Sequence, residues 1–283
     1  MNRLNIDRIL SNGIFPHPFP TPQLVETHLS YLLLGKSFAY KFKKEIKYSF
    51  LDFSTLEQRK YFCEREVLLN NRFTKGLYLG VVPIRQNGSE IHVDGTEGKV
   101  IDYAIKMKRL KDDRQMHRML ERNQVTQKHI RDVASTLRIF HQQTTVIHRP
   151  FDRAVFSARF NDLQSVSAFV GTALGSVSAN IIANAVLTSD AFLKEHQDLF
   201  SKRVDDGWVR DCHGDLHSRN IFLYARPILF DCIEFNDEFR QIDILDELAF
   251  FCMDLEAAGF DDLSKSFMTF YCAKDQAGFG KEE

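Results

Sequence analysis

Residues 210–221 read Arg210-Asp211-Cys212-His213-Gly214-Asp215-Leu216-His217-Ser218-Arg219-Asn220-Ile221. Two short apolar strands are predicted to follow, over 221–224 and 228–230, and Asp231 comes directly after the second. In an antiparallel hairpin, the residue before the first strand and the residue after the second lie at the same end, so Asn220 and Asp231 should be neighbours. An amide oxygen and a carboxylate together suit Mg²⁺ that is already bound to phosphates.

Asp215 lies on the same loop, five residues before Asn220, where its carboxylate can accept a proton from a hydroxyl group. The stretch matches the kinase catalytic-loop pattern H-R-D-L-x-x-x-N, except that Gly214 replaces the arginine. Chance would produce the four fixed positions on the order of once in a thousand chains of this length. The sequence therefore predicts phosphoryl transfer, with Asp215 as the base and with Asn220 and Asp231 as metal ligands.

The order His-Gly-Asp-x-x-x-x-Asn, hairpin, Asp resembles the aminoglycoside phosphotransferase and choline kinase superfamily. Further stretches resemble a bacterial branch of aminoglycoside phosphotransferase-like proteins, whose members are often fused to an ATPase domain that is absent here. They are Glu26-Thr27-His28, Ala39-Tyr40-Lys41-Phe42-Lys43-Lys44, Leu51-Asp52-Phe53-Ser54-Thr55-Leu56-Glu57 and Arg240-Gln241-Ile242-Asp243. The resemblance implies an ATP- and Mg²⁺-dependent kinase of small molecules with the α+β, protein-kinase-like two-lobed fold. In choline and methylthioribose kinases an acidic residue follows the metal aspartate by two positions, whereas Glu234 follows Asp231 by three.

The order of predicted elements indicates the same two lobes. Residues 1–23 hold four of the seven prolines and are expected to form an extended lead-in. A helix is predicted over 54–73. The predicted strands are Ser30–Leu34, Phe38–Phe42, Leu77–Arg85 and Val100–Met107. Long stretches without glycine or proline then predict helices, so we expect a strand-rich nucleotide-binding N-lobe over 24–108 and a helical catalytic and substrate C-lobe over 109–283.

The resemblance also implies a lysine on an N-lobe strand that contacts the ATP phosphates and pairs with a glutamate on the following helix. Lys41 and Glu66 are the preferred pair. Lys43 lies on the same strand face as Lys41, and Glu64 is close to Glu66, so both remain alternatives.

Three further roles follow from the resemblance. Thr27 and His28 occupy the first turn, where related kinases place a phosphate-covering loop. The chain from Met107 to Arg109 would be the hinge whose backbone meets adenine. An aspartate at the position of Asp243 steadies the catalytic loop in related kinases, so a buried structural role is expected.

Composition excludes little but sets expectations about partners. Lys and Arg total 37 against 38 Asp and Glu, which gives no reason to expect a nucleic-acid partner. No apolar run reaches membrane-spanning length and no signal peptide is visible, so we expect a cytoplasmic protein without a membrane partner. Five scattered cysteines predict reduced thiols.

Two segments bear on the acceptor. The acidic residues over 231–262 are opposed by the single base Arg240, which predicts either a pocket for a cationic acceptor or an ordinary solvated helix. Residues 154–206, mostly helical in composition up to 200, occupy the place of an insertion that helps to shape the acceptor pocket in related kinases. The chain ends at Glu283, where related kinases carry more helix, so the C-lobe is either compact or a shortened form.

The expected reaction is transfer of the ATP γ-phosphoryl group to a hydroxyl of a small molecule, such as an amino sugar or amino alcohol. A non-catalytic nucleotide-binding regulator and a protein-directed kinase remain alternatives, although Gly214 argues against the latter, since arginine at this position commonly reads activation-loop phosphorylation. A zinc site at His213 and His217 would need a helix, and Gly214-Asp215 indicates a loop. The sequence does not choose between ATP and GTP, nor does it give the oligomeric state.

Overall fold

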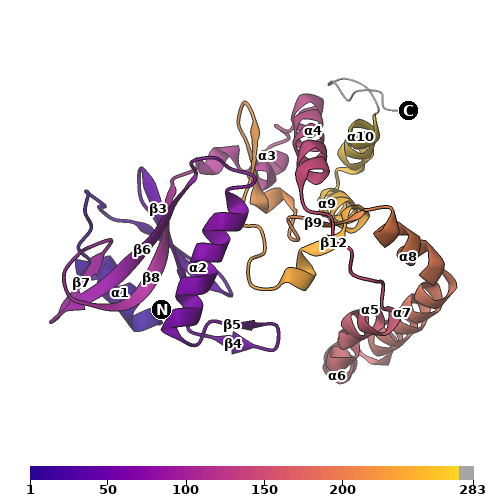
Figure 1. Ribbon diagram of the computed structural model, residues 1–283, viewed down its shortest axis with the longest axis horizontal. Helices are drawn as coiled ribbons and strands as arrows, with labels where there is room; N and C mark the ends of the chain where they lie inside the picture. The colour runs from indigo at the N-terminus through magenta and orange to yellow at the C-terminus, as the bar shows by residue number, and fades with distance from the viewer. Residues whose placement is uncertain (274–283) are drawn as a thin grey trace. The chain divides into compact units, whose positions relative to one another are not determined.

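The computed structural model describes residues 1–273, and six strands of its N-terminal part join in one antiparallel sheet (Figure 1). Their spatial order is β1 (Gln23–Glu26), β2 (Ser30–Leu34), β3 (Phe38–Lys43), β8 (Lys99–Lys108), β6 (Tyr78–Asn87) and β7 (Glu90–Val93). Lys41 on β3 lies opposite Leu32 on one side and Ile105 on the other, so β3 is hydrogen-bonded on both edges. A separate small hairpin is formed by β4 (Lys47–Tyr48) and β5 (Leu51–Asp52).

Helix α1 (Arg3–Asn12) occupies 10 residues of the segment 1–23 that is expected to be extended, so that expectation is wrong for these residues. The side chain of Asn2 caps the helix by accepting from the backbone N–H of Asn5 at 3.0 Å. All four prolines of the segment lie beyond residue 15, and they therefore carry no information about its start. Ile6 and Ile9, about one turn apart, are buried.

Helix α2 (Leu56–Asn70) confirms the helix predicted over 54–73. Thr55 caps its start by accepting from the N–H of Gln58 at 3.2 Å. The helix packs against β8 and β6, where Cys63 shares a hydrophobic cluster with Ile105.

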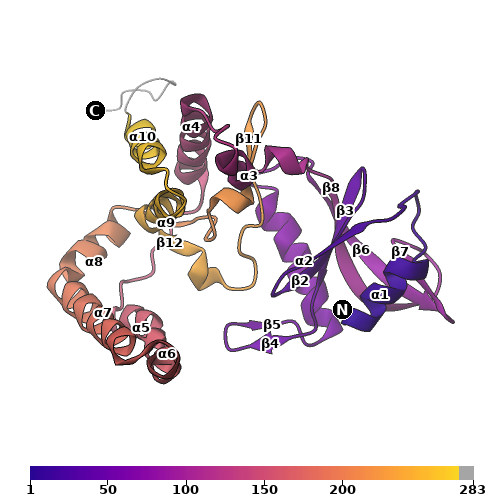
Figure 2. The same ribbon diagram turned by 180° about the vertical axis from the view of Figure 1, so that it is seen from behind.

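Alternation along β3 sends its side chains to two covered faces of the sheet. Tyr40 belongs to the cluster that contains Ile6 of α1, whereas Ala39 belongs to the cluster that contains Cys63 of α2. Figures 1 and 2 show α1 and α2 on opposite faces of the sheet. Lys41 shares the α2 face with Ala39, so its charge is directed toward the helix.

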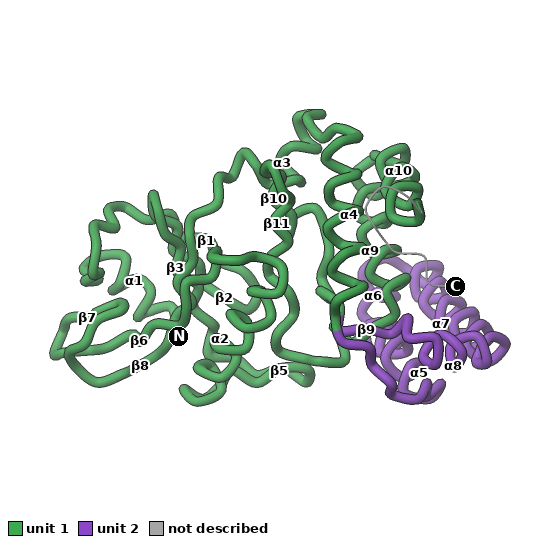
Figure 3. The backbone as a smooth tube through the Cα atoms, turned by 45° about the horizontal axis from the view of Figure 1, so that its top comes forward, with its two compact units in different colours: residues 1–144, 212–283 green, residues 145–211 purple. Residues whose placement is uncertain are grey.

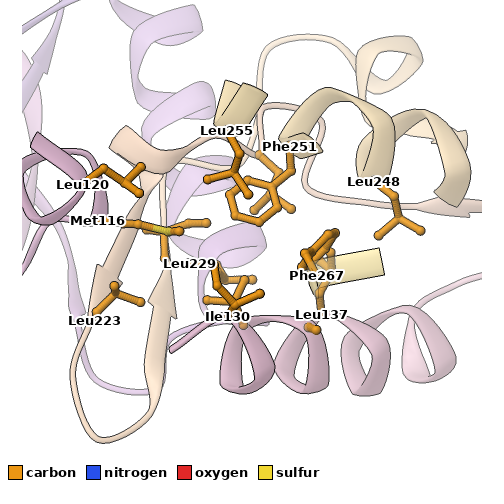
Figure 4. Packing of buried hydrophobic residues seen from close by; sticks show 14 of the residues in the cluster. Met116, Leu120, Ile130, Leu137, Leu223, Leu229, Leu248, Phe251, Leu255 and Phe267 are labelled. Carbon is orange, nitrogen blue, oxygen red and sulfur yellow. The ribbon is translucent and has the colours of Figure 1, made fainter. Parts of the chain in front are cut away.

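The C-terminal elements share a separate hydrophobic core (Figure 4). They are α3 (Met116–Glu121), α4 (Gln127–Gln143), β10 (Ile221–Leu223), β11 (Pro227–Leu229), α9 (Ile244–Ala257) and α10 (Asp261–Cys272). Ile130, Leu137 and Leu229 are buried here with Phe251 and Phe267, whose rings meet edge to face with centroids 4.8 Å apart. This core carries the loop on which the predicted catalytic residues lie.

Residues 145–211 form a second compact unit, coloured separately in Figure 3. Its elements are α5 (Arg153–Asn161), α6 (Ser167–Leu174), α7 (Ser176–Glu195), α8 (Gln197–Asp205) and β9 (Val209–Asp211). Inside it, the ring of Phe151 stacks on that of Phe200 with centroids 4.8 Å apart. The first unit holds residues 1–144 and the chain from Cys212 onward, so it includes both the sheet and the helical core. The predicted lobes divide the chain differently, and their boundary at 108/109 stays a prediction.

The predicted α+β fold is confirmed, with a strand-rich part up to Lys108 and a mainly helical part after it. An internal strand that carries lysine, followed by a helix on the face of that lysine, is the arrangement of the protein-kinase-like fold. Among residues 1–273, none of the helices combines the length and apolar character that crossing a bilayer requires.

Replacing Phe251 with alanine should lower the free energy of unfolding by about 3–5 kcal/mol, because the buried ring is lost and a cavity remains. Phe250→Ala on the same helix is the matched control, since that ring is 38% exposed. Its loss should cost about 1 kcal/mol or less. Chemical denaturation of both variants, followed by circular dichroism, measures the difference, and equal losses would contradict this description of the core.

Candidate active site

The loop from Cys212 to Asn220 carries the predicted base and ends in a 3-10 turn that leads into β10. Asn220 Nδ2 donates to the backbone oxygen of Asp215 at 3.0 Å and to its Oδ2 at 3.1 Å. His217 Nε2 lies 3.5 Å from the same carboxylate oxygen. Two side chains of the loop therefore orient the half-buried carboxylate of Asp215.

Asp215 stays ionised at neutral pH in this setting. Burial alone would raise the pKa of Asp215, but the hydrogen bond and charge of His217, together with Asn220, hold it below its ordinary value. Burial alone would lower the pKa of His217, yet its contact with Asp215 raises it. An ionised carboxylate is the form that can accept a hydroxyl proton.

Asp231 follows β11 and lies at the same end of the hairpin as Asn220. The N–H of Phe230 donates to the backbone oxygen of Asn220 at 3.1 Å, so the structure brings the two predicted metal ligands together. Asp231 has a φ of +64°, in the left-handed region that residues other than glycine rarely adopt. Its N–H donates to the hydroxyl of Tyr78 at 3.3 Å. Strain of this kind is typical of sites where the direction of a side chain matters.

The donor set at this end of the hairpin fits a hard cation. Burial alone would raise the pKa of Asp231, but the ammonium group of Lys41 lowers it, so the carboxylate stays charged. Because Asn220 donates through Nδ2, its Oδ1 is the atom that could ligate a cation. One carboxylate and one amide oxygen are a ligand set that Mg²⁺ accepts when phosphate supplies further oxygens.

Lys41 and Glu66 are in contact, and so is the alternative Lys43. Lys41 Nζ donates to Glu66 Oε1 at 2.8 Å, and Lys43 Nζ donates to Glu66 Oε2 at 2.7 Å. The remaining partners distinguish the two lysines, because Lys41 pairs with Asp231 and Lys43 pairs with Glu234. Lys41 is therefore the lysine that reaches the proposed metal ligand.

The side chain of Glu247 on α9 holds the catalytic loop by accepting hydrogen bonds from the backbone of the loop. Its Oε1 accepts from the N–H groups of His213 at 2.6 Å and Gly214 at 2.8 Å, and its Oε2 lies 2.6 Å from His141 Nε2. Asp243, for which a buried structural role is expected, is only partly buried, and it caps α9 by accepting from the N–H of Leu245 at 2.8 Å. Glu247 lies one helical turn further along, and no local pattern in the sequence points to its contact with the loop.

His213 supports the loop from within. Because the backbone oxygen of Phe230 can only accept, the contact of 2.9 Å to His213 Nε2 requires that nitrogen to carry the proton. Burial lowers the pKa of His213, which keeps the ring neutral. Residues 213–217 are not helical, so the spacing of His213 and His217 does not form a zinc pair.

Three buried side chains in residues 1–273, His141, Cys212 and Glu247, lie close enough to suggest a metal site. Hydrogen bonds account for the group. His141 Nδ1 lies 2.8 Å from the hydroxyl of Tyr271, and both carboxylate oxygens of Glu247 are engaged as described above. The group therefore links α4, α9 and α10 to the catalytic loop.

Gly214 is required by the backbone at the position where protein kinases carry arginine. Its φ is +84°, and a Cβ would lie 2.7 Å from the carbonyl oxygen of Phe239 and 3.1 Å from Cα of Arg240. Arg240 is buried against the same loop and donates to the backbone oxygen of Ile233 at 2.9 Å. The close approach of the two segments excludes a side chain at position 214.

Helix α2 is attached to the segment after Asp231 by more than Glu66. Arg65 pairs with Asp237, and Asn70 Oδ1 accepts from the N–H of Cys232 at 3.0 Å. Arg72 Nη2 lies 3.3 Å from the sulfur of Cys232. The end of the helix and this segment are therefore fixed to each other from Arg65 to Arg72.

Other predicted residues lie apart from this cluster. Thr27 and His28 are exposed on the turn between β1 and β2. Glu64 is exposed and lies 3.7 Å from Lys60, so Glu66 rather than Glu64 faces the lysines of β3.

The backbone N–H groups of the predicted hinge are largely used in hydrogen bonds to neighbouring strands and turns of the N-terminal part. Met107 is buried on β8, the N–H of Lys108 donates to Leu77 at 2.9 Å, and the N–H of Arg109 donates to Ser37 at 2.9 Å. An adenine edge would therefore have to meet carbonyl oxygens here or amides further along the chain.

The acidic run over 231–262 is used mainly for internal contacts. Asp254 accepts from the N–H of Ser218 at 2.8 Å, and Glu256 accepts from the hydroxyl of Ser264 at 2.8 Å. Together with the contacts of Glu247 to the catalytic loop, these hydrogen bonds indicate that the acidic residues stabilise the fold rather than line a pocket for a cationic acceptor.

No protein-family model matches the chain. Three curated proteins described as uncharacterised, one from Mycobacterium bovis and two from strains of Mycobacterium tuberculosis, are each 30% identical to it over 253 residues. The match covers 88% of this chain and 49% of each relative, so the chain spans about half the length of the curated relatives it matches.

Two solved structures are similar at low identity. A choline/ethanolamine kinase family protein from Mesorhizobium loti matches with a TM-score of 0.48 and 11% identity, over 95% of this chain and 75% of that chain. An aminoglycoside-3'-phosphotransferase of type VIII matches with a TM-score of 0.43 and 17% identity, over 89% of this chain and 86% of that chain. Both scores lie below 0.5, a range in which the likeness adds nothing to the fold already described.

Gly214→Ala should destabilise the protein by about 1–3 kcal/mol, because the backbone must adopt a left-handed φ while the new Cβ meets a carbonyl oxygen. Gly259→Ala is a matched control, since Gly259 has the same φ of +84° but nothing within 4 Å of its Cβ position. The difference in unfolding free energy between the two variants isolates the crowding. Similar losses would mean that the loop relaxes around a side chain.

Glu247→Gln should lower stability at neutral pH by about 1.5–3 kcal/mol, because bonds to a buried charged acceptor are weakened. Burial alone would raise the pKa of Glu247, but the hydrogen bond with His141 holds it below its ordinary value of 4.5. The wild-type carboxylate therefore contributes fully above about pH 4.5, and its contribution is lost as pH falls through the lower folded-state pKa. The free energy of unfolding, measured by chemical denaturation at several pH values, should fall less steeply from neutral to acid pH for Glu247→Gln than for the wild type, and parallel pH profiles would contradict this role of Glu247.

Proposed function

We propose that this chain is an ATP- and Mg²⁺-dependent phosphotransferase that moves the γ-phosphoryl group to a hydroxyl of a small molecule, such as an amino sugar or amino alcohol. One observation carries the proposal. Asp215, Asn220 and Asp231 converge at one end of the β10–β11 hairpin, and Lys41 contacts Asp231 while it is paired with Glu66. A base, two oxygen ligands and a paired lysine are the parts that phosphoryl transfer needs.

The residues divide the chemistry as follows. The carboxylate of Asp215 accepts the hydroxyl proton while the hydroxyl oxygen forms a bond to the γ-phosphorus. The bond from that phosphorus to the β–γ bridging oxygen breaks, and ADP leaves. Asn220 and Asp231 would hold Mg²⁺, which supplies neutralisation of phosphate charge. Lys41 would exchange Asp231 for phosphate oxygens, with Glu66 keeping it in reach.

A small-molecule acceptor is proposed from the resemblance of the loop His213-Gly214-Asp215 to the aminoglycoside phosphotransferase and choline kinase superfamily. The lack of space at Gly214 supports this choice, because no arginine is available there to read a phosphorylated activation loop. We also propose a cytoplasmic location, where ATP is abundant, and no nucleic-acid partner.

The test is Mg²⁺-dependent transfer of phosphate from ATP to components of a metabolite extract and an aminoglycoside panel, with products detected by mass spectrometry. Asp215→Asn should reduce the rate by roughly 10²–10⁴-fold, because the proton acceptor is lost. Asp261→Asn, at the exposed start of α10, is the control and should retain the wild-type rate.

Two results would overturn the proposal in different ways. ATP binding without any product would favour a nucleotide-binding regulator. Phosphate on protein rather than on a metabolite would favour a protein-directed kinase.

A further inference from the structure

Lys43 and Glu234 form a second ion pair beside the pair of Lys41 and Asp231. Both side chains are nearly inaccessible, with 1% and 7% of their surface exposed. Burial alone would lower the pKa of Lys43, yet the carboxylates of Glu234 and Glu66 hold it above its ordinary value, so the ammonium group stays charged. The proposed reaction uses neither Lys43 nor Glu234.

Five charged side chains alternate in sign through direct contacts, in the order Asp231, Lys41, Glu66, Lys43, Glu234. The two ends of this series lie three residues apart on one loop, and the two lysines share one face of β3. The loop is therefore attached to β3 at two points, and Glu66 is held between them.

The two attachments differ in their access to solvent. Asp231 is 38% exposed and Lys41 is 11% exposed, so phosphate can replace Asp231 beside Lys41, and water can replace Lys41 beside Asp231. Separating Lys43 from Glu234 would instead leave the buried carboxylate of Glu234 without its counter-charge, which is strongly unfavourable. One attachment is exchangeable, and the other is fixed.

We infer that Lys43 and Glu234 are positioning residues, which keep Glu66 and the loop of Asp231 against β3 while Lys41 exchanges Asp231 for a nucleotide phosphate. This role rests on the function proposed above. It also assigns the carboxylate of Glu234 to Lys43 rather than to a metal ion. The shared carboxylate of Glu66 explains why two lysines are needed, since Lys43 continues to hold Glu66 when Lys41 turns toward phosphate.

Amide hydrogen exchange without nucleotide tests the fixed attachment. The N–H of Ile233 donates to the backbone oxygen of His213 at 3.1 Å, and the N–H of Cys232 donates to Asn70, so both report opening of the loop. Lys43→Met should accelerate their exchange by at least about tenfold relative to the sheet amides, whereas Lys41→Met should change it by about twofold or less.

Two further variants make the exchange test decisive. Lys44→Met is the matched control, because it removes the neighbouring exposed pair with Glu26. If Lys43→Met does not fold, Glu234→Gln replaces it, since the amide keeps the shape and removes the charge; about threefold acceleration is then expected. Exchange that is equally fast in Lys41→Met, or unchanged in both Lys43→Met and Glu234→Gln, would overturn the inference.

Measurements of MgATP affinity distinguish a positioning role of the Lys43–Glu234 pair from a purely structural one. Lys43→Met should weaken MgATP binding by about tenfold, and Lys43→Arg should restore most of the affinity, because guanidinium can pair with both carboxylates. A faster-exchanging loop with unchanged MgATP affinity would show that the pair is structural only. If the wild type itself does not bind MgATP, the proposed function fails, whereas the exchange rates without nucleotide still decide whether the attachment is fixed.

Discussion

The carboxylate of Glu66 is fully buried and accepts from two lysines of β3, and the geometry of the site depends on this arrangement. A buried carboxylate without partners is costly, and so is a buried lysine, so α2 can pack on the sheet only with Glu66 facing Lys41 and Lys43. That rotation of the helix also directs Arg65 and Asn70 toward the chain that follows Asp231. One requirement for charge pairing therefore fixes the helix, the strand and the loop relative to one another.

The catalytic loop is supported from a different direction. Glu247 and His141 belong to helices of the C-terminal core, and they fix the backbone of His213 and Gly214. The two supported loops are joined directly, because the N–H of Ile233 donates to the backbone oxygen of His213. Asp215 and Asp231 are thus held in position by two separately packed cores. Rigid support of this kind is what a preorganised site needs.

Local features of the sequence were sufficient for much of this architecture. The hairpin after Asn220, the strand at Phe38–Lys43 and the helix after Thr55 are each determined by residues close in the chain, through turn chemistry, alternation and capping. Local patterns could not decide between neighbouring residues whose roles depend on tertiary contacts. Alternation places Lys41 and Lys43 on one face, and only the position of the Asp231 loop distinguishes their roles.

The loop support illustrates the same limit. Glu247 lies one helical turn beyond Asp243, and only the packing of α9 against the loop brings its carboxylate to the backbone of His213 and Gly214. The helix at Arg3–Asn12 was missed because the prolines that suggested an extended segment all follow it.

The crowding at Gly214 also restricts how this loop can evolve. An arginine at this position would have to displace the backbone at Phe239 and Arg240, where a Cβ already meets an oxygen at 2.7 Å. A long side chain at 214 therefore requires compensating changes in a segment some twenty-five residues away in sequence. The effect of a mutation at 214 depends on the residues that pack against it, and this epistasis means that replacing glycine by arginine would need more than one mutation.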